Sequence, residues 1–247
     1  MKAIIMAAGV GTRLQTLNIN KPKCLITVGS TTLIRRSVNL LVNKGISDIT
    51  VIVGFMAHLI RNELNNDVAY FENPDFISTN SIKSLWYAKD LLEDNVLLLN
   101  GDLYYEHGIL DYAINQTNPV VMLADSTRID NADYRFSFSG DQINQFGKHL
   151  TNHETDGEYV GIVRIDQSFI KTFKDALEEM IISGKSNIWW EDVLYSFIEK
   201  RIPIHYFDVA GTFWSDVDTL QDYNYLQNWI KNQDMPMPHK IIQSARK

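Results

Sequence analysis

The sequence contains a single cysteine, Cys24, among its 247 residues. One cysteine cannot form an intrachain disulfide, and scarce cysteine favours a reducing compartment, so we expect a cytoplasmic protein. No apolar run reaches the roughly 18 residues of a membrane span, so no membrane span is expected. Residues 1–8 are too short for a signal peptide, because a glycine loop follows them directly. These absences argue against secreted and membrane-spanning classes.

Positive charge is also scarce. The chain has 23 Lys and Arg residues against 30 Asp and Glu residues, which gives a net charge of −7. Affinity for duplexes comes mainly from neutralising phosphates, so we expect no nucleic-acid partner. Small anions can still bind where a few cations converge. The 45% of hydrophobic residues and the length predict one large folded domain.

The N-terminal half alternates apolar runs with amphipathic stretches. Strands are expected at 2–6, 49–53, 68–71 and 96–99, and helices at 31–44, 56–64 and 82–92. Such alternation favours α/β architecture with buried, mostly parallel strands. The second half reads as shorter strands at 120–123, 134–138, 142–146, 159–165 and 204–209, with helices near 167–182, 189–200 and 220–230. We predict a Rossmann-like, mostly parallel mixed sheet flanked by helices, with a smaller β-rich part, in one domain over 1–230 and a tail over 231–247.

A glycine loop follows the first strand. Residues 6–14 read MAAGVGTRL and residues 21–23 read KPK. Glycines let backbone N–H groups approach an anion, and Arg13, Lys21 and Lys23 provide cations nearby. A plain strand-to-helix turn explains the glycines alone equally well. A dinucleotide fingerprint would need a third glycine where Leu14 stands, and a Walker A loop would need Gly-Lys-Ser/Thr.

This segment resembles the signature of the nucleotidyltransferases that make sugar nucleotides and related activated head groups. Their pattern is a strand, Ala-Ala-Gly-x-Gly-[Thr/Ser]-Arg-Leu, a spacer and Pro-Lys; only the spacer, residues 15–18, departs from the common Pro-Leu-Thr. The resemblance implies that the loop and Arg13 hold the triphosphate and that Lys23 contacts the phosphates at the reacting centre. The nucleotide-binding residues so expected are Ala7, Ala8, Gly9, Val10, Gly11, Thr12, Arg13, Lys23 and Gly101.

Three carboxylates are candidate metal ligands. Asp102 follows a buried strand, where ligands of open α/β sheets bind and where a carboxylate can hold Mg²⁺; capping of a turn is the alternative. In the family, an Asp at this position binds the catalytic Mg²⁺. Residues 208–222, DVAGTFWSDVDTLQD, resemble the family segment that completes the metal site. We favour Asp218 as the second ligand and leave Asp216 open, because residues two apart on an extended segment face the same side.

Further motifs resemble the CTP:phosphocholine cytidylyltransferase branch, whose members activate phosphocholine, aminoethylphosphonate or phosphoglutamine for surface glycans and lipids. They are Asn73-Pro74, Asn80, Ser84, Asn100-Gly101-Asp102, residues 157–161, Trp190-Glu191-Asp192 and Trp214-x-Asp-Val-Asp. Asn80 and Ser84, one helical turn apart, fit a contact with the base, or simply the start of a helix.

Aromatic faces with carboxylates suit an ammonium group through cation–π attraction and counter-charge. Because two adjacent tryptophans on a helix cannot face the same way, we expect one of Trp189 and Trp190 to be exposed or to line a cavity. The acceptor-binding residues that we predict are Lys148, Glu158, Trp189, Trp190, Glu191, Asp192 and Trp214. Lys148 is assigned to the acceptor phosphate, with a solvated surface lysine as the alternative.

The expected protein is a Mg²⁺-dependent cytidylyltransferase that transfers CMP from CTP to a small phosphorylated acceptor. Residues 1–125 would mainly bind the nucleotide and residues 126–218 the acceptor. The catalytic residues would be Arg13, Lys23, Asp102 and Asp218. A sugar-1-phosphate nucleotidyltransferase that uses UTP or dTTP is the first alternative, and a non-catalytic nucleotide sensor the second. The tail is compatible with an interface in a homo-oligomer.

Overall fold

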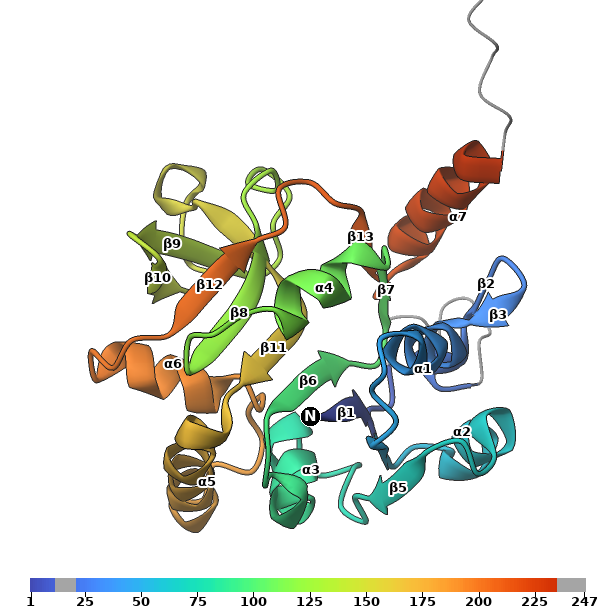
Figure 1. Cartoon of the computed structure of the whole chain (residues 1–247), viewed down its shortest axis with the longest axis horizontal. Coiled ribbons are helices and arrows are strands. Elements are labelled where there is room, and N and C mark those ends of the chain that lie inside the picture. The colour runs from blue at the N-terminus through green and yellow to red at the C-terminus, as the bar shows by residue number, and fades with distance from the viewer. Residues whose placement is uncertain (12–20, 235–247) are drawn as a thin grey trace, which may run out of the picture.

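A computed structural model of the chain describes residues 1–11 and 21–234. Its centre is a nine-stranded sheet with the order β5-β4-β1-β6-β11-β8-β12-β10-β9 (Figure 1). The strands are β1 (Lys2–Ala7), β4 (Ile49–Val53), β5 (Ala69–Glu72), β6 (Val96–Asn100), β8 (Val120–Asp125), β9 (Arg135–Ser139), β10 (Gln142–Phe146), β11 (Gly157–Ile165) and β12 (His205–Asp208). Two small ribbons pair β13 (Trp214–Asp216) with β7 (Leu103–Tyr105) and β2 (Thr27–Val28) with β3 (Thr31–Thr32).

The two halves of the sheet pair differently. Strands β5, β4, β1 and β6 are parallel, as the alternation of strands and helices predicts. Strand β11 then runs antiparallel to both β6 and β8, and β9 and β10 form a hairpin through Gly140, whose φ is +62°. Only β12 beside β8 restores parallel pairing. Parallel pairs need long crossovers, whereas β8, β9, β10 and β11 follow one another through short connections.

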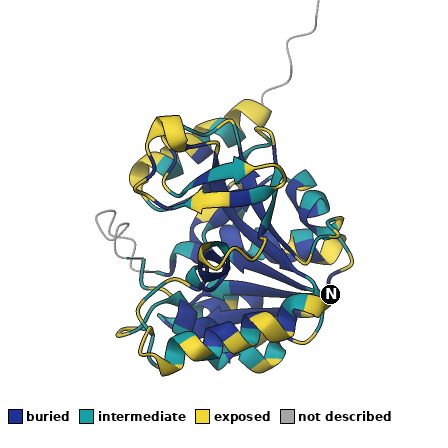
Figure 2. Ribbon diagram, turned by 90° about the vertical axis from the view of Figure 1, so that its left-hand side faces the viewer, coloured by how far each residue is buried: buried dark blue, intermediate teal, exposed yellow. Residues whose placement is uncertain are grey.

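Helices cover both faces of the sheet, whose central strands are dark blue and buried in Figure 2. Alternation along β1 sends Ile5 to one face and Ile4 to the other. The face of Ile5 packs against α1 (Leu33–Asn43), α2 (Ala57–Leu64) and α4 (Gly108–Ile114), and the face of Ile4 against α3 (Ser81–Tyr87), α5 (Gln167–Ile182) and α6 (Asp192–Glu199). Helix α7 (Leu220–Asp234) instead packs Leu226 beside the β7–β13 ribbon. The α/β class is therefore confirmed.

Helix α1 falls within the expected range 31–44, and local sequence signals mark both of its ends. The Thr32 hydroxyl accepts the Arg35 N–H, and Gly45, with φ of +78°, follows the last turn. Val42, although apolar, lies on the outer side of this helix with half of its surface exposed.

The sequence patterns predicted neither α4 nor β7, and they began α6 too early. Strand β7 has three residues and exists only through its pairing with β13, a contact that local periodicity cannot reveal. Helix α6 begins at Asp192, so the two adjacent tryptophans precede it. Across residues 1–11 and 21–234, no helix combines the length and apolar character needed to cross a membrane.

Candidate active site

One cavity of about 410 Å³ opens beyond the carboxyl ends of β1 and β6, within the size range of small-ligand sites. It extends from the glycine loop to the antiparallel half of the sheet. The predicted site residues that line it are Ala7, Ala8, Gly9, Gly11, Lys23, Asn80, Ser84, Gly101, Asp102, Lys148, Glu158, Trp189, Glu191, Trp214, Asp216 and Asp218. Thr12 and Arg13 lie outside the described residues.

Three predicted residues do not line this cavity. Val10 belongs to the loop but is not part of the cavity wall. Trp190 is fully buried in the core, and its indole N–H donates to Asn100 Oδ1 at 3.3 Å. Asp192 accepts the backbone N–H of Trp189 at 2.8 Å, at the start of α6. The structure thus corrects the expectation of acceptor contact for Trp190 and Asp192, whereas Trp189, 40% exposed, is the tryptophan that lines the cavity.

Two glycines permit close approach of the backbone at the glycine-loop end of the cavity. Gly101 follows β6 and donates its N–H to Met6 O at 3.0 Å, where an added Cβ would lie 2.7 Å from that oxygen. Gly11 has φ of +63°, and a Cβ there would lie 2.5 Å from Lys23 Cγ. The missing side chains therefore let the turn after β6 touch β1 and let Lys23 cross over the loop.

Lys23 lies between two carboxylates. It begins a 3₁₀ turn, Lys23–Leu25, directly after Pro22. Its Nζ donates to Asp102 Oδ2 at 2.7 Å and to Asp218 Oδ1. Burial lowers the pKa of the Lys23 ammonium, but the two carboxylates outweigh burial and raise that pKa above its usual value. Lys23 is therefore a permanent cation in this end of the cavity.

Asp102 and Asp218 contact the same cation, so we can ask whether the two carboxylates could bind one Mg²⁺ ion. Their oxygens share the Lys23 ammonium, so both can reach a single positive charge. Mg²⁺ is commonly held by one or two carboxylates together with substrate phosphates, so this donor set fits it. Within the part of the chain that is described, no group of three or more His, Cys, Asp or Glu side chains is arranged to hold a metal.

Asp216 differs from the other two carboxylates. It lies on β13, in register with Leu103 on β7. Burial, followed by the charges of Asp102 and Asp218, raises its pKa to about 7. Lys23 Nζ contacts Asp102 and Asp218, so the geometry favours that pair as the candidate ligands.

The far end of the cavity is aromatic and acidic. Tyr134 stacks on Tyr195, with 5.1 Å between centroids, and meets the Trp189 ring edge-on at 5.8 Å. Glu191 is buried beside them, and burial raises its pKa to about 7. The Tyr159 hydroxyl is also buried and has no hydrogen-bond partner among the described residues. This end offers ring faces, one buried carboxyl and one available hydroxyl.

Sequence reasoning did not name Tyr134 and Tyr195, and it gave Asn100 no role of its own. Tyr134 and Tyr195 resemble ordinary core residues of a strand and an amphipathic helix, and only the fold brings them together. Asn100 donates to Glu191 Oε1 at 3.2 Å and accepts from Trp190, so it links the turn of Asp102 to the aromatic end of the cavity. Its place in Asn100-Gly101-Asp102 was the available signal.

Lys148 and Glu158 lie at the rim and wall of the same end. Lys148 Nζ donates to both oxygens of Asp133, at 2.7 and 2.8 Å, and lies 5.5 Å from the Trp189 ring centroid. Glu158 accepts the Asp133 N–H at 2.5 Å and lies 3.6 Å from the Arg128 guanidinium. Lys148 is therefore paired but accessible, whereas Glu158 already has a positive neighbour.

Asn80 and Ser84 belong to the start of α3. Asn80 is the N-cap and accepts the Ser81 N–H at 2.7 Å. Ser84 is buried, and its hydroxyl accepts from Asn73 Nδ2 at 2.9 Å. Both line the cavity, so the structural role and the predicted base contact share the same residues.

Comparison with known proteins identifies the family of this chain. Residues 2–158 match the family model described as nucleotidyl transferase. The chain belongs to this family. The resemblance carried by the glycine loop and Pro22-Lys23 is thus confirmed, and the protein is a nucleotidyltransferase.

This nucleotidyltransferase is 24% identical over 247 residues to a CTP:phosphoglutamine cytidylyltransferase from Campylobacter jejuni, with 90% of this chain and 97% of the relative covered. It is 23% identical over 238 residues to a choline-phosphate cytidylyltransferase from Streptococcus pneumoniae, with 95% and 100% covered. The solved structure of a CTP:phosphocholine cytidylyltransferase from Streptococcus pneumoniae matches with a TM-score of 0.77 and 23% identity, over 93% of this chain and 98% of that one. The last likeness confirms the α/β nucleotidyltransferase fold.

Proposed function

We propose that this nucleotidyltransferase is a Mg²⁺-dependent cytidylyltransferase that joins CMP from CTP to a small phosphorylated acceptor and releases pyrophosphate. The observation that carries the proposal is one cavity with two chemically distinct ends. Lys23, Asp102 and Asp218 converge beside the glycine loop, and Glu191 lies among aromatic rings at the other end. The names of the two similar cytidylyltransferases support CTP as the nucleotide.

The reaction needs positioning and charge neutralisation rather than an enzyme nucleophile. An oxygen of the acceptor phosphate attacks the α-phosphorus of CTP, and the bond from that phosphorus to the β-phosphate oxygen breaks, so that pyrophosphate leaves. Lys23 neutralises charge on the α-phosphate and the attacking group. Arg13, outside the described residues, is assigned to the triphosphate. Asp102 and Asp218 would hold Mg²⁺, which would polarise the phosphate and screen the repulsion between the two anions.

The acceptor end favours a head group with positive charge or amide character. Glu191 offers a buried counter-charge, and the rings of Trp189 and Tyr134 offer faces for cation–π contact. Lys148 lies at the rim, where it can leave Asp133 and contact the acceptor phosphate. Asn80 and Ser84 are assigned to the cytosine edge. Phosphocholine, phosphoglutamine and aminoethylphosphonate are the acceptor types that combine these features.

The test is pyrophosphate release with Mg²⁺ over a matrix of nucleotides and acceptors. CTP, UTP, dTTP, ATP and GTP are each paired with phosphocholine, phosphoethanolamine, phosphoglutamine, aminoethylphosphonate and glucose-1-phosphate. We expect release with CTP and at least one nitrogen-bearing acceptor. Release only with glucose-1-phosphate and UTP or dTTP would assign the protein to sugar activation instead. Binding of CTP by calorimetry without release from any pair would favour a nucleotide sensor.

A further inference from the structure

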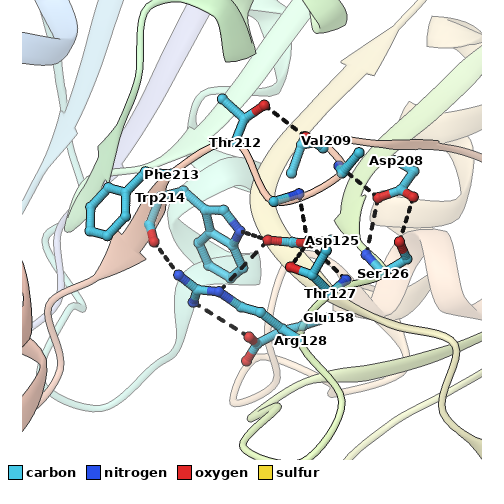
Figure 3. Close-up of polar contacts among 12 residues, drawn as sticks. Asp125, Ser126, Thr127, Arg128, Glu158, Asp208, Val209, Thr212, Phe213 and Trp214 are labelled. Carbon is cyan, nitrogen blue, oxygen red and sulfur yellow. Dashed lines mark hydrogen bonds and ion pairs between the residues drawn. The ribbon is translucent and has the colours of Figure 1, made fainter. Parts of the chain in front are cut away.

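A polar cluster lies behind the acceptor wall of the cavity (Figure 3). Its centre is Asp125, the last residue of β8, with only 2% of its surface exposed. Asp125 Oδ1 accepts the Thr127 N–H, the Thr127 hydroxyl and the Gly211 N–H at 3.0, 2.7 and 3.2 Å. Asp125 Oδ2 accepts the indole N–H of Trp214 at 2.9 Å. One carboxylate therefore fixes both a loop and the Trp214 ring.

Arg128 forms an ion pair with this carboxylate and makes three further contacts. Its Nε lies 3.7 Å from Asp125 Oδ2, and its Nη1 lies 3.6 Å from Glu158 Oε2. Its Cζ lies 3.9 Å from the centroid of the Trp214 ring, and its Nη2 donates to Trp214 O. A planar guanidinium can make these contacts together, which a lysine ammonium cannot do.

The cluster also adjoins the strand that carries the candidate metal ligands. Trp214 begins β13, which pairs with β7 so that Asp216 lies opposite Leu103. The Val217 N–H donates to Asp102 O at 3.1 Å. One edge of β13 is therefore held by β7, and its first residue is held by Asp125 and Arg128.

We propose that Arg128, held in place by Asp125, is a positioning residue that fixes Trp214 and Glu158 in the wall of the acceptor site. Arg128 is then the cation that contacts the Trp214 ring and the Glu158 carboxylate. The positive group of the acceptor then binds elsewhere, against Glu191 and Trp189. Only the expected effect on kinetics rests on the proposed function. The contacts among Asp125, Arg128 and Trp214 belong to the protein without substrate.

The physical test uses 5-fluorotryptophan and fluorine NMR of the whole chain without substrates. The protein has five tryptophans, and the Trp214→Phe variant assigns the resonance of Trp214. We expect Arg128→Met and Asp125→Asn to shift or broaden that resonance. Asparagine has one acceptor oxygen, so it cannot serve both the loop donors and the indole N–H. An unchanged Trp214 resonance in Arg128→Met would overturn the proposal.

Asp208→Asn is the matched control. Asp208 also holds the loop, because it accepts from Ser126 N, Ser126 Oγ and Ala210 N at 3.0, 2.6 and 2.9 Å. No described contact joins it to Trp214 or Arg128. We expect its loss to leave the Trp214 resonance in place. A shift as large as that of Asp125→Asn would mean that general loosening of the loop, and not the Arg128 contact, moves Trp214.

The kinetic test compares how Arg128 variants change the KM for the acceptor and the KM for CTP. Arg128→Met should raise the KM for the acceptor about tenfold, the size expected for a lost charged contact on an aromatic ring, and leave the KM for CTP within about twofold. Arg128→Lys should recover part of the loss. Equal changes in both KM values would contradict a positioning role. If the wild type transfers no CMP at all, the proposed function fails, and the fluorine spectra still decide whether Arg128 holds Trp214.

Discussion

The two ends of the cavity are built in different ways. The end that we propose for the nucleotide consists of a backbone loop after a parallel strand, with Lys23, Asp102 and Asp218 converging beside it. The acceptor end is assembled from side chains of distant segments, among them Tyr134 and Glu191, around antiparallel strands. Changes at the nucleotide end should therefore reduce every reaction of the enzyme, whereas changes at the acceptor end should act on one substrate only.

The largest effect should come from Asp102→Asn. Loss of one of two carboxylates that hold Mg²⁺ removes charge stabilisation at the reacting phosphate, so we expect pyrophosphate release to fall by about a thousandfold or more. Circular dichroism should be unchanged. Asp111→Asn, which breaks only a surface pair with Lys44, is the control and should stay within about twofold. Near-normal activity of Asp102→Asn would refute the assignment of the metal site.

Lys23→Met should rank second. It removes the cation assigned to the α-phosphate but leaves both carboxylates, so we expect kcat to fall about a hundredfold with every acceptor. Steady-state kinetics with two different acceptors measure this. Lys44→Met, which removes a surface ammonium, is the matched control. A loss confined to the KM of one acceptor would place Lys23 at the wrong end of the cavity.

Glu191→Gln should separate the two ends. We expect kcat/KM for phosphocholine to fall about tenfold or more, because a desolvated counter-charge is lost, while the KM for CTP stays constant. Burial raises the pKa of Glu191 to about 7, so the wild-type kcat/KM should rise with pH up to that value. The variant should lack this rise. Glu199→Gln, at the exposed end of the same helix, should behave like the wild type.

Glu191 should also make the stability of the wild type fall as pH rises, whereas kcat/KM rises over the same range. Glu191 has a folded-state pKa of about 7 against 4.5 ordinarily, so between these pH values the folded state binds more protons and stability falls as pH rises. Glutamine does not titrate. From pH 4 to pH 8 the free energy of unfolding of Glu191→Gln should therefore gain on the wild type by on the order of 2–3 kcal/mol. Denaturant unfolding without substrates measures this, and parallel curves would refute the buried, shifted carboxyl.

Lys148→Ala should have the smallest effect. Its side chain is 43% exposed and already paired with Asp133, so its contribution is screened by solvent. We expect the KM for the acceptor to rise about threefold to tenfold, with kcat unchanged. Lys171→Ala, which breaks an exposed pair with Asp175 on α5, is the control. A change in the KM for CTP would reassign Lys148.

The same contrast explains what the sequence could predict. The glycine loop, Lys23 and Asp102 are close to strand ends or to each other in the chain, so their pattern revealed the family and predicts where the nucleotide binds. Tyr134 and Arg128 carry little local signal, because Tyr195, Glu158 and Trp214, which they contact, lie far away in the sequence. Trp190 followed the expected motif but turned into the core, where its indole N–H supports Asn100. The roles of the site residues, and of the tail beyond residue 234, stay predictions.

The most direct test of the whole account is the product of one reaction mixture. Wild-type protein, Mg²⁺, CTP and UTP are incubated with phosphocholine, phosphoglutamine, aminoethylphosphonate and glucose-1-phosphate together, and the products are identified by mass spectrometry. The account predicts a CMP group joined to one of the three nitrogen-bearing acceptors, with no uridine product. A uridine or cytidine product of glucose-1-phosphate, or CMP without any acceptor attached, would contradict it.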